Sequence, residues 1–267
     1  MKKILSLAIA FLFIFCCFAG CSGNNDKKIV VAASVTPHAD ILKICKEELE
    51  KQGYTLEIRE MTDYVTPNNA TESGDVDANY FQHQPYLDSF NESNNTHLVS
   101  VAKIHYEPYA IYAGTVSSLS DLTEGSIVAV TNDPSNEARA LQLLAAQGLI
   151  KLKDGVGLKA AKSDIIENPL NLDIREMEAA LLPTVLDEVA IAVINGNYAI
   201  GAGLKVSEAL AAESADSEAA QTFANILVVK EGNENLPKIK ALVEALQSEA
   251  VRNYINETFD KAVVPIF

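Results

Sequence analysis

Aromatic and polar side chains are concentrated in the segment Asp77–Leu87, which reads Asp-Ala-Asn-Tyr-Phe-Gln-His-Gln-Pro-Tyr-Leu. Its Tyr80, Phe81, His83 and Tyr86 are of the types that build an apolar box with a polar tip, suited to an alkyl or thioether group. The alternative is that these aromatic side chains simply pack the core. The pattern by itself favours the core, because clustered apolar side chains are usually buried.

A second segment, Thr131–Arg139, has the features of a carboxylate site at the start of a helix. Asp133 is a suitable N-cap, and Pro134 is a suitable first helical residue. Asn136 and Arg139 are three residues apart, so they share a helix face near its N-terminus. Backbone N–H groups, the helix dipole and a guanidinium together favour a carboxylate. From spacing alone, an ion pair between Arg139 and a nearby acid on a solvated surface is equally well supported.

Two asparagines follow or begin apolar, strand-like segments. Asn195 comes directly after a buried strand pattern, where its amide could hydrogen-bond a ligand amine. Ordinary turn chemistry for Asn195-Gly196 is the alternative and, taken alone, the stronger one. Asn225 begins another strand-like segment and is a similar, isolated amide.

The sequence has no recognisable catalytic or metal-binding motif. It contains no Gly-x-Ser-x-Gly elbow, P-loop or Gly-x-Gly-x-x-Gly turn, and His83 has no obvious nucleophile beside it. The histidines are scattered, with no His-x3-His or Cys-x2-Cys spacing; they are His38, His83, His97 and His105. We therefore expect no catalytic residue, no cofactor and no metal.

The N-terminus predicts an exported protein. Lys2 and Lys3 precede an apolar run, Ile4–Phe18, which is too short for a typical spanning helix. A basic start, an apolar stretch and small residues before Cys21 are typical of a secretory signal, which we place at residues 1–20.

The segment Phe18–Cys21 resembles the bacterial lipobox, with Phe18 where Leu is commoner. The resemblance implies cleavage before Cys21 and acylation of its thiol and new amine. Residues 21–27 are then a polar, lipidated tether. The one cysteine left beyond them, Cys45, shares a helical face with apolar residues, so we expect an inert core thiol and no disulfide.

Composition excludes several classes of protein. The 267 residues carry a formal net charge of −15, and 48% of the side chains are hydrophobic. Such an apolar chain is globular rather than disordered. Its acidity disfavours nucleic acids and anionic lipid surfaces, since both are bound mainly through Lys and Arg.

The elements that must position these residues alternate along the chain. The pattern predicts strands at Ile29–Ala33, Thr55–Met61, Val76–Ala78, Ile104–Ala113, Ser126–Val130, Leu172–Met177, Val189–Ile194 and Ala224–Val229. It predicts helices at Pro37–Glu50, Pro67–Ser73, Pro134–Gln147, Ser207–Ala212, Pro237–Gln247 and Glu249–Phe259. This alternation indicates an α/β protein with parallel sheets that are covered on both faces.

We expect two α/β lobes with a ligand cleft between them. Two extended segments, Tyr106–Gly114 and Ala224–Lys230, are the candidate crossings. Residues 28–110 and 229–267 would then form the first lobe, and residues 111–228 the second.

Taken together and in order, these segments resemble the methionine-binding lipoproteins of bacterial ABC importers, the MetQ/NlpA family. The resemblance spans the mature chain and rests on Thr62–Asn68, Asp77–Leu87, Asn132–Arg139, Leu152–Gly157, Glu167–Pro169 and Ala192–Asn195. It implies a two-lobed periplasmic-binding-protein type fold, with two mixed sheets flanked by helices and joined by two crossing segments. It also implies delivery of methionine to a membrane permease driven by an ATPase, by a lipid-anchored, extracytoplasmic and monomeric protein.

The resemblance also implies roles for individual residues. Tyr64, Phe81, His83 and Tyr86 would surround the thioether, and Arg139 supported by Asn136 would hold the α-carboxylate. Asn195 and Asn225 would serve the α-amino group. The sequence departs from the family in having Asn195-Gly196-Asn197, where Asn followed by Thr or another small polar residue is familiar.

Other functions remain as alternatives. The ligand could be a methionine-containing dipeptide or another small amino acid. A metal-binding transport protein and an enzyme are less well supported, because the chain lacks the ligand spacing of the first and the base–nucleophile set of the second.

Overall fold

The computed structural model describes residues 27–214 and 221–267. The expected signal, most of the tether and the lipidation site Cys21 therefore lie outside the described residues. Within the described part, no helix has the length and apolar character needed to cross a bilayer.

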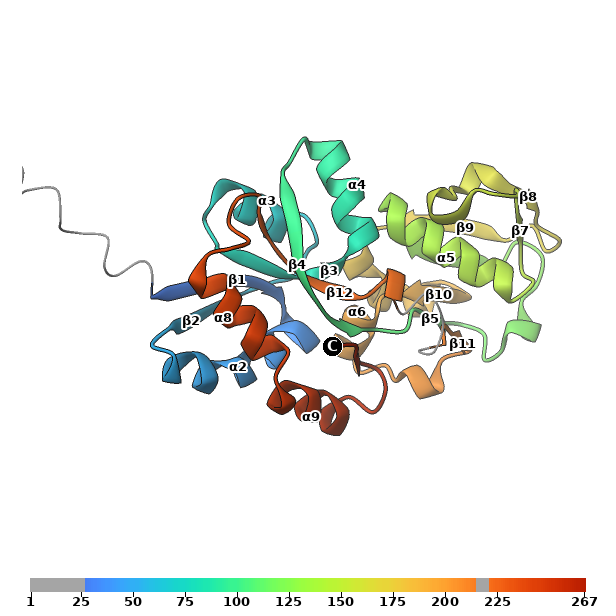
Figure 1. Ribbon diagram of the computed structural model, residues 1–267. Coiled ribbons are helices and arrows are strands. Elements are labelled where there is room, and N and C mark those ends of the chain that lie inside the picture. Colours follow the sequence, from blue (N-terminus) through green and yellow to red (C-terminus); the bar gives the residue numbers. More distant parts are fainter. Residues whose placement is uncertain (1–26, 215–220) are drawn as a thin grey trace, which may run out of the picture.

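Six strands form the first sheet, in the order β13-β4-β12-β3-β1-β2 (Figure 1). They are β1 (Lys28–Ser34), β2 (Thr55–Met61), β3 (Ala78–His83), β4 (Leu98–Tyr106), β12 (Asn225–Lys230) and β13 (Val264–Pro265). β1 pairs in parallel with β2 and β3, whereas β12 runs antiparallel between β3 and β4. The sheet is therefore mixed, as the family resemblance implied, and not parallel, as the alternation of strands and helices had indicated.

Helices cover this sheet and close its core. They are α2 (Asp40–Lys51), α3 (Thr66–Ser73), α4 (Gln84–Asn94), α8 (Pro237–Leu246) and α9 (Glu249–Thr258), with a π-helical turn at Val35–Ala39. Cys45 on α2 packs among the buried side chains of this core and is 1% exposed. Burial raises the pKa of its thiol to about 12, which confirms an inert core cysteine.

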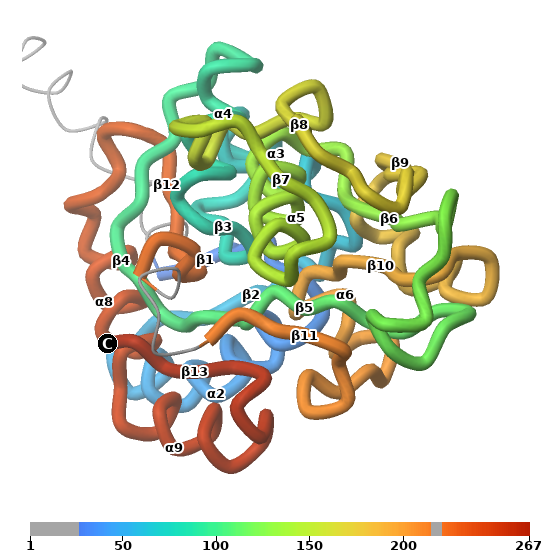
Figure 2. Tube along the Cα trace, turned by 90° about the vertical axis from the view of Figure 1, so that its right-hand side faces the viewer, coloured from blue at the N-terminus to red at the C-terminus, as the bar shows by residue number. Residues whose placement is uncertain are grey.

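Five strands form the second sheet, in the order β11-β5-β10-β6-β9. They are β5 (Ala110–Ala113), β6 (Ile127–Thr131), β9 (Asp173–Met177), β10 (Ile191–Ile194) and β11 (Ala211–Ala212), and β7 (Lys151–Leu152) pairs with β8 (Ile165–Glu167) apart from them. β6 is parallel to β9 and β10, and β5 is antiparallel to β10 and β11. Figure 2 views the molecule from this side, with β11 alongside β5.

The helices of the second lobe are short apart from one. They are α5 (Pro134–Ala146), α6 (Gly196–Gly201) and the 3₁₀ segments Leu119–Asp121, Gly157–Lys159, Lys162–Asp164, Ala179–Glu188 and Val206–Glu208. We call the elements around the first sheet the first lobe and those around the second sheet the second lobe.

The chain passes between the sheets once within the predicted crossing Tyr106–Gly114 and once outside the other predicted crossing. The segment predicted as one strand, Ile104–Ala113, is two strands of different sheets, and Glu107–Tyr109 links them. The predicted crossing Ala224–Lys230 is wrong, because β12 is hydrogen-bonded between two strands of the first sheet from Asn225 onward. The second crossing lies earlier, between β11 and β12. A continuous apolar run does not by itself distinguish a central strand from a connecting one.

Two other predicted elements are wrong. The strand expected at Val76–Ala78 is β3, which begins at Ala78 and carries the aromatic segment. Two of its polar residues, Asn79 and Gln82, are buried because they bond to each other and to Asn68 of α3. The helix expected at Ser207–Ala212 is a 3₁₀ turn followed by β11. Its alanines favour a helix, but pairing with β5 outweighs that local preference.

Candidate functional site

A cavity lies between the two lobes, and all eight predicted ligand-binding residues line it. Its lining is Tyr64, Phe81, Gln82, His83, Tyr86, Glu107, Asn136, Arg139, Asn195, Gly196, Asn197 and Asn225. β3 ends at His83, β6 leads into α5, and β10 ends just before Asn195. The carboxyl ends of these strands therefore converge on the cavity, where α/β proteins commonly bind ligands.

One wall of the cavity is aromatic. Phe81 and Tyr86 are buried, and both pack against Tyr64 with ring centroids 5.7 Å apart. Together with Phe90 they form a cluster separate from the cores of the two sheets. These side chains thus face a cavity rather than a sheet core, which favours the binding box over simple core packing.

The position of His83 is fixed by both of its ring nitrogens. Its Nδ1 accepts a hydrogen bond from the backbone N–H of Tyr86 at 3.2 Å, so His83 caps α4. Its Nε2 therefore carries the proton and donates to Asn136 Oδ1 at 2.9 Å. Burial, followed by the nearby charge of Arg139, lowers the pKa of His83 to about 4. The imidazole is neutral at pH 7.

Asn136 connects the two lobes at this point. Its Oδ1 also accepts from Asn195 Nδ2 at 3.0 Å, and its Nδ2 donates to the carboxylate of Asp133. Asp133 caps α5 through the backbone N–H of Asn136 at 2.9 Å. The predicted N-cap is confirmed, and it orients an amide that contacts three other side chains.

The guanidinium of Arg139 is buried and already has an anionic partner that the sequence did not predict. Its Nε and Nη2 donate to Glu213 at 2.8 and 2.5 Å, and Nη2 also donates to the Glu107 carbonyl at 3.1 Å. Burial by itself would raise the pKa of Glu213, but the charge and hydrogen bonds of Arg139 lower it overall. The edge of the guanidinium formed by Nε and Nη2 is thus held by Glu213. The remaining nitrogen, Nη1, lies on the other edge of the planar group.

Several hydrogen-bond acceptors line the cavity besides the aromatic residues. Asn195 Oδ1 is buried and has no hydrogen-bond partner among the described residues. Asn225 Oδ1 accepts from His38 Nε2 at 2.9 Å. Glu107 also lines the cavity and is 5% exposed. An unpartnered buried acceptor beside a carboxylate suits a ligand that brings N–H donors.

Sequence reasoning missed several residues of this site. Gln82, Glu107, Gly196 and Asn197 line the cavity, and Glu213 holds Arg139 from the second crossing. One signal was available for Glu107, since it is the only acid in the apolar segment Ile104–Ala113. Glu213 stands in a stretch with other acids, so its sequence neighbourhood carries no comparable signal.

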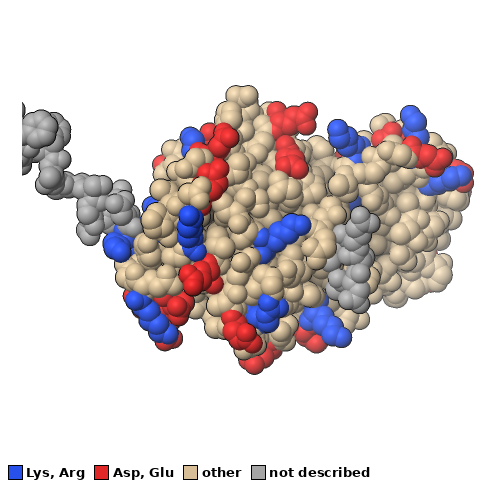
Figure 3. All heavy atoms as spheres, in the orientation of Figure 1, with Lys and Arg blue, Asp and Glu red and all other residues tan. Residues whose placement is uncertain are grey.

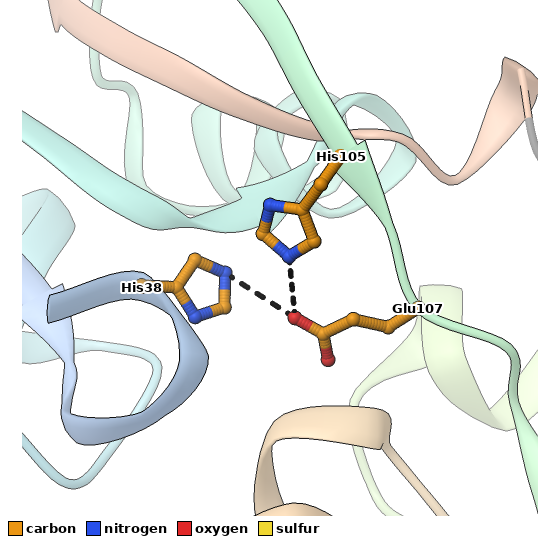
Figure 4. Close-up of side chains that lie close together, drawn as sticks. All are labelled: His38, His105 and Glu107. Atoms are coloured by element: carbon orange, nitrogen blue, oxygen red, sulfur yellow. Dashed lines mark hydrogen bonds and ion pairs between the residues drawn. The ribbon is translucent and has the colours of Figure 1, made fainter. Parts of the chain in front are cut away.

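Two of the scattered histidines also meet at the cavity wall. His38, His105 and Glu107 are buried, with their potential ligand atoms within 4.8 Å of one another (Figure 4). His105 Nε2 lies 2.7 Å from Glu107 Oε1, and its Nδ1 contacts the hydroxyl of Tyr80. Both ring nitrogens of His105 are engaged in hydrogen bonds within the protein. A metal ion that binds His105 would have to break one of these bonds.

Comparisons with known proteins agree with this geometry. The family model for the NlpA lipoprotein matches residues 29–267. The D-methionine-binding lipoprotein MetQ of Salmonella typhimurium is 42% identical over 92% of this chain and 92% of its own length. A lipoprotein structure from Ruminococcus gnavus has a TM-score of 0.89 and 55% identity, covering 90% of this chain and all of that chain. A nutrient-binding protein from Burkholderia cenocepacia bound to methionine has a TM-score of 0.85 and 42% identity, with the same coverage.

Proposed function

The chain belongs to the NlpA lipoprotein family, and from this premise we propose that it captures free methionine outside the cytoplasm and delivers it to an ABC importer. The observation that carries the proposal is the combination of three surfaces in one cavity. An aromatic wall, a buried guanidinium and a group of amide and carboxylate acceptors lie where a thioether, a carboxylate and an amine would meet them.

The closure of the cavity supports a single amino acid rather than a dipeptide. Direct hydrogen bonds already join the lobes around it. Tyr64 donates to Asn197 at 2.5 Å, and Tyr198 donates to the Thr62 carbonyl at 2.9 Å. A second residue in the ligand would need the lobes to stand further apart.

The composition of the wall supports binding over catalysis. Within residues 27–214 and 221–267, twelve residues line the cavity, and none of them is a Ser, Thr, Cys or Lys nucleophile. Both ring nitrogens of His83 are occupied by Tyr86 and Asn136, so the imidazole has no free site for proton transfer. The relative from Salmonella is named as a binding lipoprotein, in keeping with a transport role.

The proposed partners are a membrane permease, its ATPase subunit and the membrane itself through acylated Cys21. On the face shown in Figure 3, Lys and Arg are interspersed with Asp and Glu among the described residues. With a net charge of −15, attachment through lipid is better supported than adhesion through basic residues. We expect the binding protein to act as a monomer.

Calorimetry on protein stripped of bound ligand tests the proposal. The soluble domain is unfolded, dialysed and refolded, then titrated with L-methionine, D-methionine and glycyl-methionine, with leucine as a control. We expect saturable 1:1 binding of methionine and much weaker binding of leucine, which lacks the polarisable sulfur. If neither methionine isomer binds, the assignment is wrong; tighter binding of glycyl-methionine would replace the amino acid with a dipeptide.

A further inference from the structure

Glu107 is a buried carboxylate on the first crossing between the lobes, and it lines the cavity. Its side chain is 6% exposed. A carboxylate removed from water needs either a cation or a full set of hydrogen bonds, because an uncompensated buried charge costs several kcal/mol. The partners of Glu107 therefore indicate whether the protein itself supplies a cation for this carboxylate.

The nearest side chains to this carboxylate are two imidazoles, and the geometry indicates that both are neutral (Figure 4). The buried hydroxyl of Tyr80 has His105 Nδ1 as its acceptor, so that nitrogen carries no proton and Nε2 donates to Glu107. His38 Nδ1 has no partner among the described residues. Protonating His38 would leave a buried N–H group unpaired, which is unfavourable.

Among the described residues, Arg139 is the one cation in the lining, and it is paired with Glu213. It forms two hydrogen bonds with Glu213, and it reaches Glu107 only at the backbone carbonyl. Because Arg139 pairs with Glu213, the Glu107 carboxylate has no cation in hydrogen-bond contact with it among the described residues. Burial raises the pKa of Glu107, as expected for a carboxylate in this position.

The second oxygen of Glu107 is held in place by the start of α6. A Cβ atom added at Gly196 would lie 2.6 Å from Glu107 Oε2, so glycine permits the close approach. The backbone N–H of Asn197 also lies near this carboxylate and favours its charged form, which lowers the pKa of Glu107 and partly offsets the effect of burial. The carboxylate thus lies between the first crossing and the start of α6 in the second lobe.

We propose that Glu107 is the anionic partner of the ligand's α-ammonium group, positioned by His105 and by the start of α6, and that it restricts the ligands to primary amines. The inference rests on the proposed function, since it assumes an amino acid in this cavity. The ammonium supplies the missing positive charge, while Asn195 Oδ1 and Asn225 Oδ1 accept its other protons. Arg139 remains for the α-carboxylate.

A double cycle of protein and ligand tests this assignment. Methionine and its hydroxy analogue, 2-hydroxy-4-(methylthio)butanoate, are titrated into the wild type and into Glu107→Gln. We expect Glu107→Gln to weaken methionine binding by about 30-fold to several-thousand-fold, as for truncation of one partner in a buried charged pair. Binding of the hydroxy analogue, which has no ammonium, should change by less than about threefold, because it forms no ion pair with Glu107.

The matched control is Glu137→Gln on α5, which removes one negative charge near the cleft but outside the cavity lining. It should leave methionine affinity within about twofold of the wild type. If Glu107→Gln does not fold, Glu107→Asp keeps the charge on a shorter side chain. It should then bind methionine less tightly while still preferring it to the hydroxy analogue.

The outcomes separate this inference from the proposed function. Failure of the wild type to bind methionine would refute the proposed function. The wild type could bind methionine while Glu107→Gln weakens the binding of methionine and of the hydroxy analogue equally, or changes the binding of neither. The ammonium assignment would then be wrong and the proposed function would stand. Tight binding of Zn²⁺ alone to the ligand-free wild type, lost in Glu107→Gln, would also overturn it, since a metal would then supply the charge.

Discussion

Arg139 is held in place on several sides before any ligand arrives. Its guanidinium carbon lies 4.2 Å from the centroid of the Phe223 ring and 4.8 Å from that of Tyr109. Glu213 fixes one edge of the planar group through two hydrogen bonds. A guanidinium fixed in this way is pre-organised, so a ligand carboxylate that meets its other edge pays little entropy for ordering it.

We expect Arg139→Ala to weaken methionine binding by about 2–5 kcal/mol, since it removes one partner of a buried charged pair. Arg139→Lys should rescue little, because Lys cannot hold Glu213 with two parallel hydrogen bonds and also meet the ligand. Methionine amide, which lacks the carboxylate, should lose far less from the same mutation. Titration calorimetry with both ligands measures these losses, and equal losses would mean that Arg139 has a structural role.

The aromatic wall yields a second prediction for single residues. Phe81→Ala and Tyr86→Ala should each weaken methionine binding by about 1–3 kcal/mol, because each exposes apolar surface that the thioether otherwise buries. The free energy of unfolding of the ligand-free protein should fall by less than the free energy of binding, since these rings face a cavity. A large drop in melting temperature with unchanged affinity would instead identify them as core residues.

At the scale of elements, the site depends on how closely the strands and crossings approach one another. Gly114 follows β5 at the beginning of the second lobe, and its N–H donates to the Ala190 carbonyl at 3.0 Å. A Cβ atom at this position would lie 2.2 Å from the Val189 carbonyl oxygen and 2.7 Å from that of Leu186. These contacts are to backbone, which cannot move aside as a flexible side chain would.

Gly114→Ala should therefore destabilise the protein by about 1–3 kcal/mol or more, because the backbone of β10 or of its preceding segment must shift. The matched control is Gly201→Ala at the end of α6, where the nearest atom to the new Cβ is a Thr36 methyl group at 3.7 Å. That change should be neutral or slightly stabilising, since Ala favours a helix. Urea unfolding of both variants measures the difference; similar stabilities would show that the second sheet tolerates the shift.

At the scale of the whole molecule, three buried histidines make stability depend on pH. Burial lowers the pKa of His38 and His83 to about 4 and that of His105 to about 3. In the unfolded chain each has a pKa near 6.5. The unfolded state therefore binds more protons between these values, so stability is fully present above about pH 6.5 and is lost as the pH falls toward 4.

The free energy of unfolding should fall by up to about 1.4 kcal/mol per pH unit for each histidine in this range. The raised pKa of Glu107 acts in the opposite direction and reduces the slope. Urea titrations at pH 7.5, 6 and 5 measure the slope, and His97→Gln is the control because His97 is exposed. Equal stability at pH 7.5 and 5 would contradict the neutral state assigned to the buried imidazoles.

A further whole-molecule prediction concerns attachment to the membrane. Cys21→Ser should release the protein into the soluble fraction or leave its precursor uncleaved, because an acidic body has little attraction for anionic lipids. Washing wild-type membranes with high salt should not release it. Membrane fractionation and immunoblotting measure both, and release by salt alone would mean that the anchor is electrostatic.

The sequence alone predicted much of this protein because its signals are local. The N-cap Asp133 with Pro134, the apolar face around Cys45 and the periodicity of most strands and helices depend on near neighbours in the chain. The ordered set of motifs identified the family, and seven residues chosen from them line one cavity together with Asn225. Their binding roles remain predictions that the variants above test.

Only the tertiary structure determined which distant side chains form ion pairs and hydrogen bonds with one another. Arg139 and Glu213 are 74 residues apart, and His38 meets Asn225 across 187 residues. No periodicity or spacing connects such partners, because they are brought together by β12 returning between β3 and β4 and by the two crossings. Those contacts, together with burial, determine whether Arg139 is paired with an acid and whether Glu107 is paired with a cation. Neither can be inferred from the residues that are neighbours in the sequence.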